Sequence, residues 1–305
     1  PASTMANGAL TSVSVIPSTL VAGSTGTLAV GLTTVNPIPA GGRVTLVLPA
    51  SSGSFLTSSG GSTGVVSSTG FNAGAQTAGA SGSTITVTTS GGAAAGTALT
   101  LVLGNLRMPQ VSGGTGAYTV QTQQSDGTTL IDSGSAAQST ITAGTLAALT
   151  ITPANPVAGA TGSVGISFTT ANPIPADGRI KVTFPAGYGV SGAGSATSGT
   201  LDGSLAVSVA GQVVTVTRSS GTAATGAHSL AIAGITTPTT TGATGTPTAQ
   251  TTTNGGSAID EGAAAATTVV ASAGTLSPAS VTPGSLTAGA TSSLTLALTT
   301  TNAVP

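Results

Sequence analysis

The chain has 305 residues, of which 4% are charged and 2% aromatic, with no cysteine and a net charge of −1. Its five basic residues are scattered singly, which excludes an electrostatic nucleic-acid surface and a polybasic membrane patch. No run approaches the eighteen or so apolar residues of a membrane span, so membrane insertion is not expected. Repeated Val/Ile/Leu alternation argues against a disordered Gly/Ser linker, because such a linker buries no apolar area.

From the N-terminus onward, nearly every apolar run alternates with period two, the pattern of a strand with one buried face. Gly-rich turns separate the runs, and no ten-residue window shows a helical stripe. Seven to nine strands per repeat predict a two-sheet β-sandwich rather than a solenoid of short coils. In the first repeat we expect strands near 11–16, 26–34, 43–48, 64–69, 83–89, 97–103, 116–124, 128–132 and 136–143.

Two prolines in four residues follow the second expected strand. The block reads Asn36-Pro37-Ile38-Pro39, and it returns as Asn172-Pro173-Ile174-Pro175 and as residues 302–305. Proline lacks the donor that a strand ladder needs and fixes φ, so it does not belong inside a paired central strand. We therefore predict a rigid connection with a strand on each side.

These blocks belong to a tandem repeat. Gly23, Gly159 and Gly289 each stand thirteen residues before the Asn of a block, so the copies are offset by 136 and then 130 residues. The apolar positions of the neighbouring strands superpose between copies. The repeat predicts complete modules over 10–145 and 146–275, the tail of a preceding repeat over 1–9, and the opening strands of a third module over 276–305. The chain reads as a window of a longer array.

Charges also recur at matched positions. Arg43 and Arg179 are repeat equivalents, as are Asp132 and Asp260. We expect an ion pair that fixes a module or a module junction, between Arg43 and Asp132 or between Arg179 and Asp132. The alternative is four solvated charges, whose pairing would contribute about 0–1 kcal/mol.

No motif for catalysis or metal binding stands out. His228 is the one histidine, and although Ser229 adjoins it, the first repeat has no matching nucleophile and acid. The aspartates form no cluster with metal-ligand spacing, and cysteine is absent. We predict no enzyme activity, no cofactor and no metal.

The third copy opens with a strand over 292–299 in which Leu294, Leu296 and Leu298 form a complete inward face. Burial of each leucine stabilises by about 1.5–3 kcal/mol, so we expect this face to be covered. Either a further module covers it or it docks onto another subunit, and both predict self-association. Exposed Thr and Ser are candidate O-glycan acceptors, whereas no Asn-x-Ser/Thr sequon occurs.

Residues 157–162, 168–170, 172–180 and 184–187 carry a resemblance to a known repeat type. The succession Val-Ala-Gly-Ala-Thr-Gly, Phe-Thr-Thr, Asn-Pro-Ile-Pro-Ala-Asp-Gly-Arg-Ile and Phe-Pro-Ala-Gly resembles immunoglobulin-like modules. Such modules build large repetitive surface and filament proteins of bacteria and microbial eukaryotes. The resemblance implies tandem immunoglobulin-like β-sandwiches, an extracellular place at the cell surface, and no catalytic residues.

These observations favour a structural subunit of an extracellular filament, sheath or appendage that assembles by strand pairing between modules or subunits. The main alternative is the stalk of a cell-surface adhesin that presents a distant binding tip. A Thr face that binds ice or carbohydrate needs a flat, regular array, and the Thr rows here end after three residues.

Overall fold

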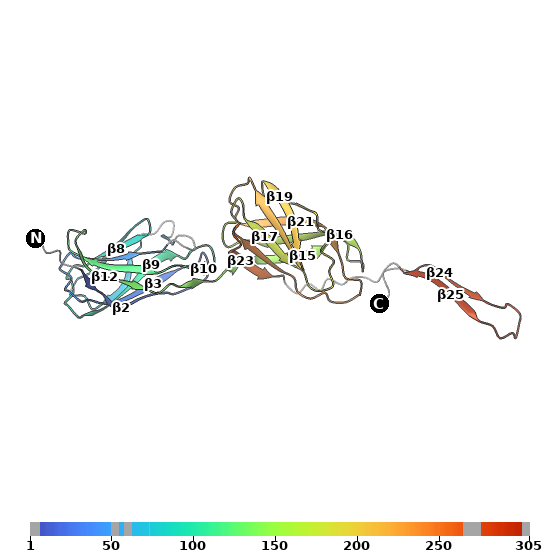
Figure 1. Ribbon diagram of the computed structural model, residues 1–305, viewed down its shortest axis with the longest axis horizontal. Helices are drawn as coiled ribbons and strands as arrows, with labels where there is room; N and C mark the ends of the chain where they lie inside the picture. The colour runs from blue at the N-terminus through green and yellow to red at the C-terminus, as the bar shows by residue number, and fades with distance from the viewer. Residues whose placement is uncertain (1–6, 50–54, 58–62, 73, 265–275, 301–305) are drawn as a thin grey trace, which may run out of the picture. The chain divides into compact units, whose positions relative to one another are not determined.

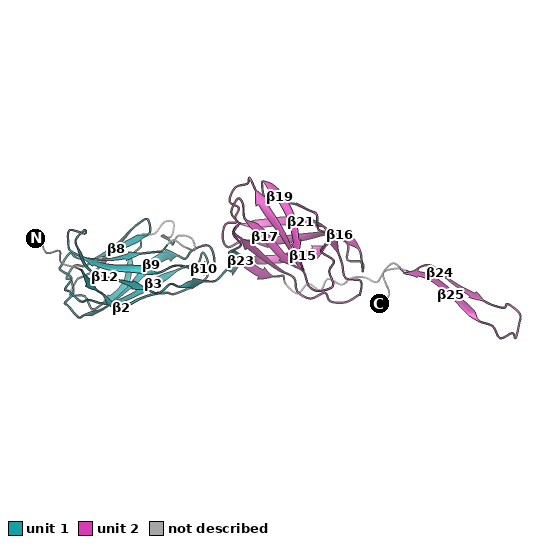
Figure 2. Cartoon of the chain, viewed as in Figure 1, with its two compact units in different colours: residues 1–144, 257–260 teal, residues 145–256, 261–305 magenta. Residues whose placement is uncertain are grey.

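The computed structural model describes residues 7–49, 55–57, 63–72, 74–264 and 276–300. Within these ranges every regular element is a β-strand (Figure 1), and no helix there is long and apolar enough to cross a membrane. The chain divides into two units, residues 1–144 with 257–260 and residues 145–256 with 261–305 (Figure 2). Each unit is built on a sandwich of two sheets, which confirms the predicted all-β fold.

The module boundaries expected from the repeat stay predictions. Residues 1–6, 265–275 and 301–305 lie outside the described residues. They include most of the expected leading tail, the expected boundary at 275 and the third proline block.

Six strands form the larger sheet of unit 1, in the order β1, β12, β11, β4, β8 and β7. Neighbouring strands are antiparallel except β1, which runs parallel to β12. The first strand of the unit is therefore paired with one of its last. The bounds are β1 Gly8–Ala9, β12 Leu130–Ala136, β11 Tyr118–Gln123, β4 Arg43–Val47, β8 Thr84–Thr88 and β7 Thr77–Ser81.

The smaller sheet of unit 1 has the order β2, β3, β9 and β5, and β6 also pairs with β9. A short ladder of β10 and β13 stands apart from it. The bounds are β2 Thr11–Pro17, β3 Thr25–Thr33, β9 Ala98–Arg107, β5 Leu56–Thr57, β6 Val65–Thr69, β10 Gly113–Gly114 and β13 Thr140–Ile141.

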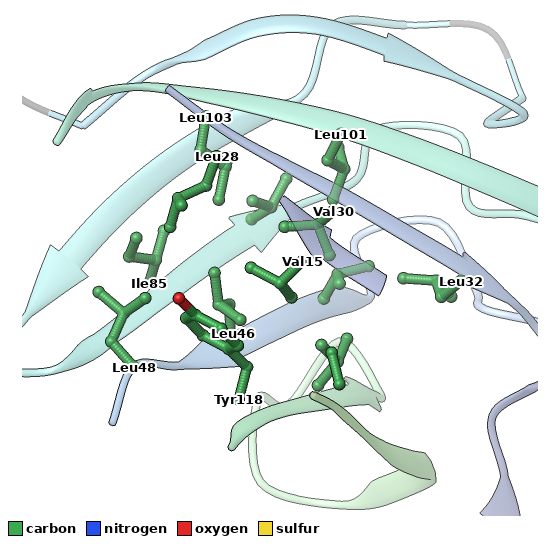
Figure 3. Close-up of a cluster of buried hydrophobic side chains, with 14 of the residues drawn as sticks. Val15, Leu28, Val30, Leu32, Leu46, Leu48, Ile85, Leu101, Leu103 and Tyr118 are labelled. Atoms are coloured by element: carbon green, nitrogen blue, oxygen red, sulfur yellow. The ribbon is translucent and has the colours of Figure 1, made fainter. Parts of the chain in front are cut away.

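The core of unit 1 lies between the two sheets (Figure 3). Leu28, Val30 and Leu32 alternate along β3 and are at most 2% exposed, while Leu46 and Ile85 bury the same kind of surface from the larger sheet. Each side chain of this size contributes about 1.5–3 kcal/mol on burial. Period-two alternation on both sheets is thus what holds the unit together.

Unit 2 repeats this plan. Its larger sheet has the order β14, β23, β22, β17, β20 and β19, although the first residues of β14 and β23 are grouped with unit 1, and its smaller sheet has the order β15, β16, β21 and β18. Its core again takes alternate residues from both sheets. The bounds are β14 Gly144–Thr145, β23 Ala258–Ala263, β22 Thr248–Thr252, β17 Arg179–Thr183, β20 Val213–Ser219, β19 Ser204–Ala210, β15 Ala147–Pro153, β16 Thr161–Thr169, β21 Ala227–Thr236 and β18 Ser195–Thr197.

The last described segment is a hairpin of β24 (Leu276–Pro283) and β25 (Leu294–Thr300). It matches the pairs β2–β3 and β15–β16 of the two units in sequence. All three pairs are antiparallel and have one shift in register. The leucines that we expect to be covered are 69%, 62% and 43% exposed at Leu294, Leu296 and Leu298. Their equivalents in β3 and β16 are buried.

Candidate functional site

The proline block is the connection from β3 to β4 in unit 1 and from β16 to β17 in unit 2, as predicted. The isoleucine between the prolines supplies the pairing that proline cannot, because Ile38 exchanges two backbone hydrogen bonds with Ala93 (2.8 and 2.9 Å). Ile174 does the same with Ala224 (2.8 and 2.9 Å). Both isoleucine side chains are buried, at 3% and 0% exposed. The block is thus bonded on one side and packed on the other.

A buried carboxylate holds the start of the block in unit 1. Asp132 of β12 is 0% exposed. Its Oδ2 accepts from the backbone N–H of Val35 (3.1 Å) and of Asn36 (2.9 Å), and its Oδ1 accepts from Asn36 Nδ2 (2.7 Å). Hydrogen bonds to an ionised acceptor are the strong ones. This contact joins the last strands of the module to the connection between its early strands.

The first strand of the unit passes directly beside this contact. Gly8 of β1 pairs with Asp132 of β12, and a Cβ at Gly8 would lie 2.0 Å from Asp132 Oδ1 and 2.6 Å from Asn36 Nδ2. Only glycine fits so close to the carboxylate. The second repeat places Asn172 and Asp260 at the matching positions, and both are 0% exposed.

In unit 1 the recurring arginine, Arg43, does not pair with Asp132. Within the described residues the ion pair found joins Arg218 and Asp202. The predicted pair of Arg43 and Asp132 is therefore wrong, and the strand register gives the reason. Asp132 and Val44 both pair with Thr122, whereas Arg43 pairs with the next residue, Gln123. Successive side chains point to opposite faces, so Arg43 and Asp132 lie on opposite sides of the sheet.

Both recurring arginines instead reach the turn that follows the neighbouring strand of the sheet, β11 beside Arg43 and β22 beside Arg179. Arg179 Nη2 donates to Asn254 Oδ1 at 2.8 Å. The Arg43 guanidinium lies over Gly127, where a Cβ would fall 1.9 Å from Nη1. The recurrence of these charges therefore reflects a shared contact with a turn.

A second lock on the proline block occurs in unit 2 alone and has no sequence signal in the repeat. Arg218 is 0% exposed, and its Nη1 donates to the carbonyl oxygens of Ile174 (3.2 Å) and Pro175 (2.8 Å). Its Nη2 donates to Asp202 Oδ1 (2.6 Å) and to the Thr222 carbonyl (2.8 Å). Four acceptors bond the two Nη groups of this buried guanidinium, which would otherwise be costly to desolvate, whereas its Nε has no hydrogen-bond partner among the described residues.

Unit 1 has a hydroxyl in place of this guanidinium. Thr89 stands at the repeat position of Arg218, is 0% exposed, and its Oγ1 donates to the Pro39 carbonyl (3.4 Å).

Hydrogen bonds from the Thr222 hydroxyl, followed by its backbone N–H, lower the pKa of Asp202 in unit 2, and the Arg218 charge acts in the same direction.

The two ends of unit 1 are held by parallel pairing. At the entry, Leu10 N donates to Ser133 O (2.8 Å) beside the β1–β12 ladder. At the exit, Thr142 forms a parallel bridge with Val21, with Thr142 N donating to Leu20 O (2.7 Å) and Ala22 N donating to Thr142 O (2.9 Å). In unit 2, Leu146 N donates to Glu261 O (3.0 Å), the counterpart of the entry contact.

His228 is a buried residue of β21 at the repeat position of Leu99. It is 6% exposed, its ring lies 5.8 Å from that of Phe168, and neither ring nitrogen has a hydrogen-bond partner among the described residues. Burial lowers the pKa of His228, and the Arg218 charge lowers it further. The described part of the chain holds no group of three or more His, Asp or Glu side chains arranged for a metal.

Comparison with known proteins finds no matching family model and no matching curated protein. Similar solved structures include the C-terminal domain of the Streptococcus pyogenes antigen I/II-family protein AspA, with 7% identity, coverage of 84% of this chain and 98% of that one, and a TM-score of 0.31. The B domain of a biofilm-associated protein has 9% identity, coverage of 83% and 84%, and a TM-score of 0.26.

The collagen-binding domain of the Erysipelothrix rhusiopathiae surface protein RspB has 12% identity, coverage of 85% and 94%, and a TM-score of 0.24. At these identities and scores the similarity says nothing of what this chain binds.

Proposed function

We propose that the chain is a load-bearing spacer in an extracellular structural protein, in the manner of a stalk that holds a binding tip away from the cell. The observation that carries this proposal is the parallel pairing at both ends of unit 1. Pulling on the ends drags β1 along β12 and Thr142 along residues 20–22. The hydrogen bonds of each contact are then loaded together in shear and do not open one after another.

The carboxylate contact supports the same role. Asp132 lies in β12, the strand that carries the entry pairing, and bonds to Asn36 in the connection ahead of β4. Force that reaches β12 is therefore passed to the connection from β3 of the smaller sheet to β4 of the larger sheet. Few charges and a surface rich in Thr and Ser fit a setting outside cells, where hydroxyls rather than ions supply hydration.

Single-molecule force spectroscopy on the full chain, held at its two ends, tests this proposal. We expect two separate unfolding events, each releasing roughly 130 residues or about 430 Å of chain at about 3.3 Å per residue. Extension without resolved unfolding events would show that the units do not resist load.

Self-assembly into a filament is a second candidate, and the exposed leucines of β25 favour it. In this account another copy of the chain covers Leu294, Leu296 and Leu298 by pairing against the hairpin. Sedimentation should then show oligomers of the full chain and monomers when all three leucines are replaced by Thr. A monomer in both cases, at the same concentration, would remove this candidate while leaving the load-bearing role intact.

A further inference from the structure

We propose that the outer face of the larger sheet in unit 2 binds a neutral, hydroxyl-rich ligand, namely a short oligosaccharide. The proposal does not depend on the load-bearing role, because it uses side chains on the solvent face of one sheet, whereas the entry contact of unit 2 uses the backbone carbonyl of Glu261. It starts from a row of polar side chains that crosses this face and that the equivalent face of unit 1 has only in reduced form.

Strand register defines the row. Thr215 of β20 pairs with Lys181 of β17, and Lys181 pairs with Gln250 of β22. Gln250 Nε2 donates to Glu261 Oε2 of β23 at 3.1 Å, and Ser208 of β19 pairs with Thr215 at the other end. Residues in register share a face, so the row crosses five strands and spans about 19 Å at about 4.8 Å per strand.

The row borders a hollow of about 800 Å³. Lys181, Gln250, Glu261 and Thr215 line it, together with Thr183 and Thr248. Their neighbours along the strands point inward, and Ile180, Val182 and Val214 are each 0% exposed. A packed core therefore fixes the backbone that carries the polar groups before any ligand arrives, which lowers the ordering cost of binding.

The chemistry of the row selects the ligand. The only lysine and the only glutamate of the whole sequence both lie here. An anionic ligand would meet the Glu261 carboxylate, a cationic one would meet the Lys181 ammonium, and an apolar one would desolvate both without new hydrogen bonds. Hydroxyl groups both donate and accept, so a neutral polyhydroxyl ligand can satisfy ammonium, carboxylate, amide and threonine groups together.

Unit 1 serves as an internal reference. The same row there reads Thr86, Thr45, Gln121 and Ser133, in the same register. A hollow of about 380 Å³ on that face lies mainly over β7 and β8 and includes only Thr86 of this row. The sandwich therefore forms without Lys181 and Glu261, because their equivalents are Thr45 and Ser133. Two charged residues added to a sheet that folds without them point to a role other than stability.

Titration of the 15N-labelled full chain with neutral trisaccharides of glucose, mannose, galactose and N-acetylglucosamine, at millimolar concentration, tests the site. The variants are Lys181→Thr and Glu261→Ser, which install the residues of unit 1, and Asp177→Ser is the control for loss of an exposed charge elsewhere on unit 2. Thermal melting should show that all three variants stay folded.

We expect at least one neutral trisaccharide to shift the amide signals of Lys181, Gln250 and Glu261. Its affinity should fall at least tenfold in Lys181→Thr and in Glu261→Ser, and stay unchanged in Asp177→Ser. The proposal is overturned if no neutral trisaccharide binds, or if both row variants bind as well as the parent chain. It is also overturned if an acidic trisaccharide or a charged dipeptide is preferred, or if the same signals shift with protein concentration alone, which would indicate a second copy.

Discussion

Asp132 and Asn36 are ninety-six residues apart in the chain, yet the Asn36 side-chain amide donates to the Asp132 carboxylate at 2.7 Å. Two backbone N–H groups of the same connection complete the contact. One buried carboxylate therefore fixes where the proline block begins and joins the end of the module to its start. The recurring Asn and Asp of the repeat are explained by this contact in unit 1.

Replacement of Asp132 by Ala should destabilise unit 1 by about 3 kcal/mol, because buried donors lose a charged acceptor. Differential scanning calorimetry of the two-unit chain should show one transition at a lower temperature and the other unchanged. Asp132→Asn keeps one carbonyl acceptor and should cost less. By the repeat, Asp260→Ala should lower the other transition. If Asp132→Ala melts like the parent chain, the contact contributes nothing to stability.

Gly8→Ala should destabilise unit 1 by about 1–3 kcal/mol, the usual cost of overpacking. The new Cβ would lie 2.0 Å from Asp132 Oδ1. Gly79→Ala is the matched control in the same sheet, because a Cβ there meets nothing within 4 Å. Urea denaturation compares the two. Equal urea midpoints for the two variants would mean that β1 shifts at little cost and is not held tightly against the Asp132 carboxylate.

The Arg218–Asp202 pair should make unit 2 sensitive to strong acid. The pKa of Asp202 is lowered from 3.8, chiefly by the Thr222 hydroxyl and backbone. A carboxylate with a lower pKa when folded stabilises the protein above the unfolded pKa, and this stabilisation is lost as pH falls through the folded value. We expect the melting temperature of unit 2 to decrease once the pH is lowered below about 4. Asp202→Asn should flatten this dependence, whereas the exposed control Asp177→Asn should keep it.

His228 should affect the stability of unit 2 in a separate pH range, closer to neutral. Its folded pKa is lowered from 6.5 by burial and by Arg218, so the unfolded chain binds a proton first. Stability of unit 2 should therefore decrease as pH falls from about 7 to about 5. His228→Leu installs the residue of unit 1 and should remove this decrease, as measured by thermal melting at both pH values. The same decrease in the variant would assign it to another group.

The alternation of apolar residues was enough to predict most of the fold. The expected strands near 26–34 and 43–48 correspond to β3 and β4, and the sandwich follows from their shared core. By contrast, β7 was missed because the only alternating apolar residues of Thr77–Ser81 are two alanines around a glycine, which is a weak strand pattern. Its strand is defined by pairing with β8, and sequence spacing does not reveal such pairing.

The candidate site was predicted only in part, because the sequence shows which charges recur but not which face of a sheet each occupies. Asp132 and Arg43 recur together, yet a one-residue difference in register places their side chains on opposite faces of the sheet. Arg218 does not recur in the repeat, because Thr89 stands at its position in unit 1. Both side chains donate to the carbonyl of the second proline of the block. Pairing by charge alone overlooked Asn36, the neutral partner that Asp132 bonds.

The measurement that tests the load-bearing role most directly is force spectroscopy of Thr142→Pro beside Thr142→Val in the full chain. Proline removes the Thr142 N–H bonded to Leu20 O and the hydroxyl bonded to the same oxygen, whereas valine removes the hydroxyl alone. The account predicts a clear drop in the unfolding force of one unit for Thr142→Pro, a small change for Thr142→Val, and an unchanged force for the other unit. Equal unfolding forces in the parent chain and Thr142→Pro would contradict it.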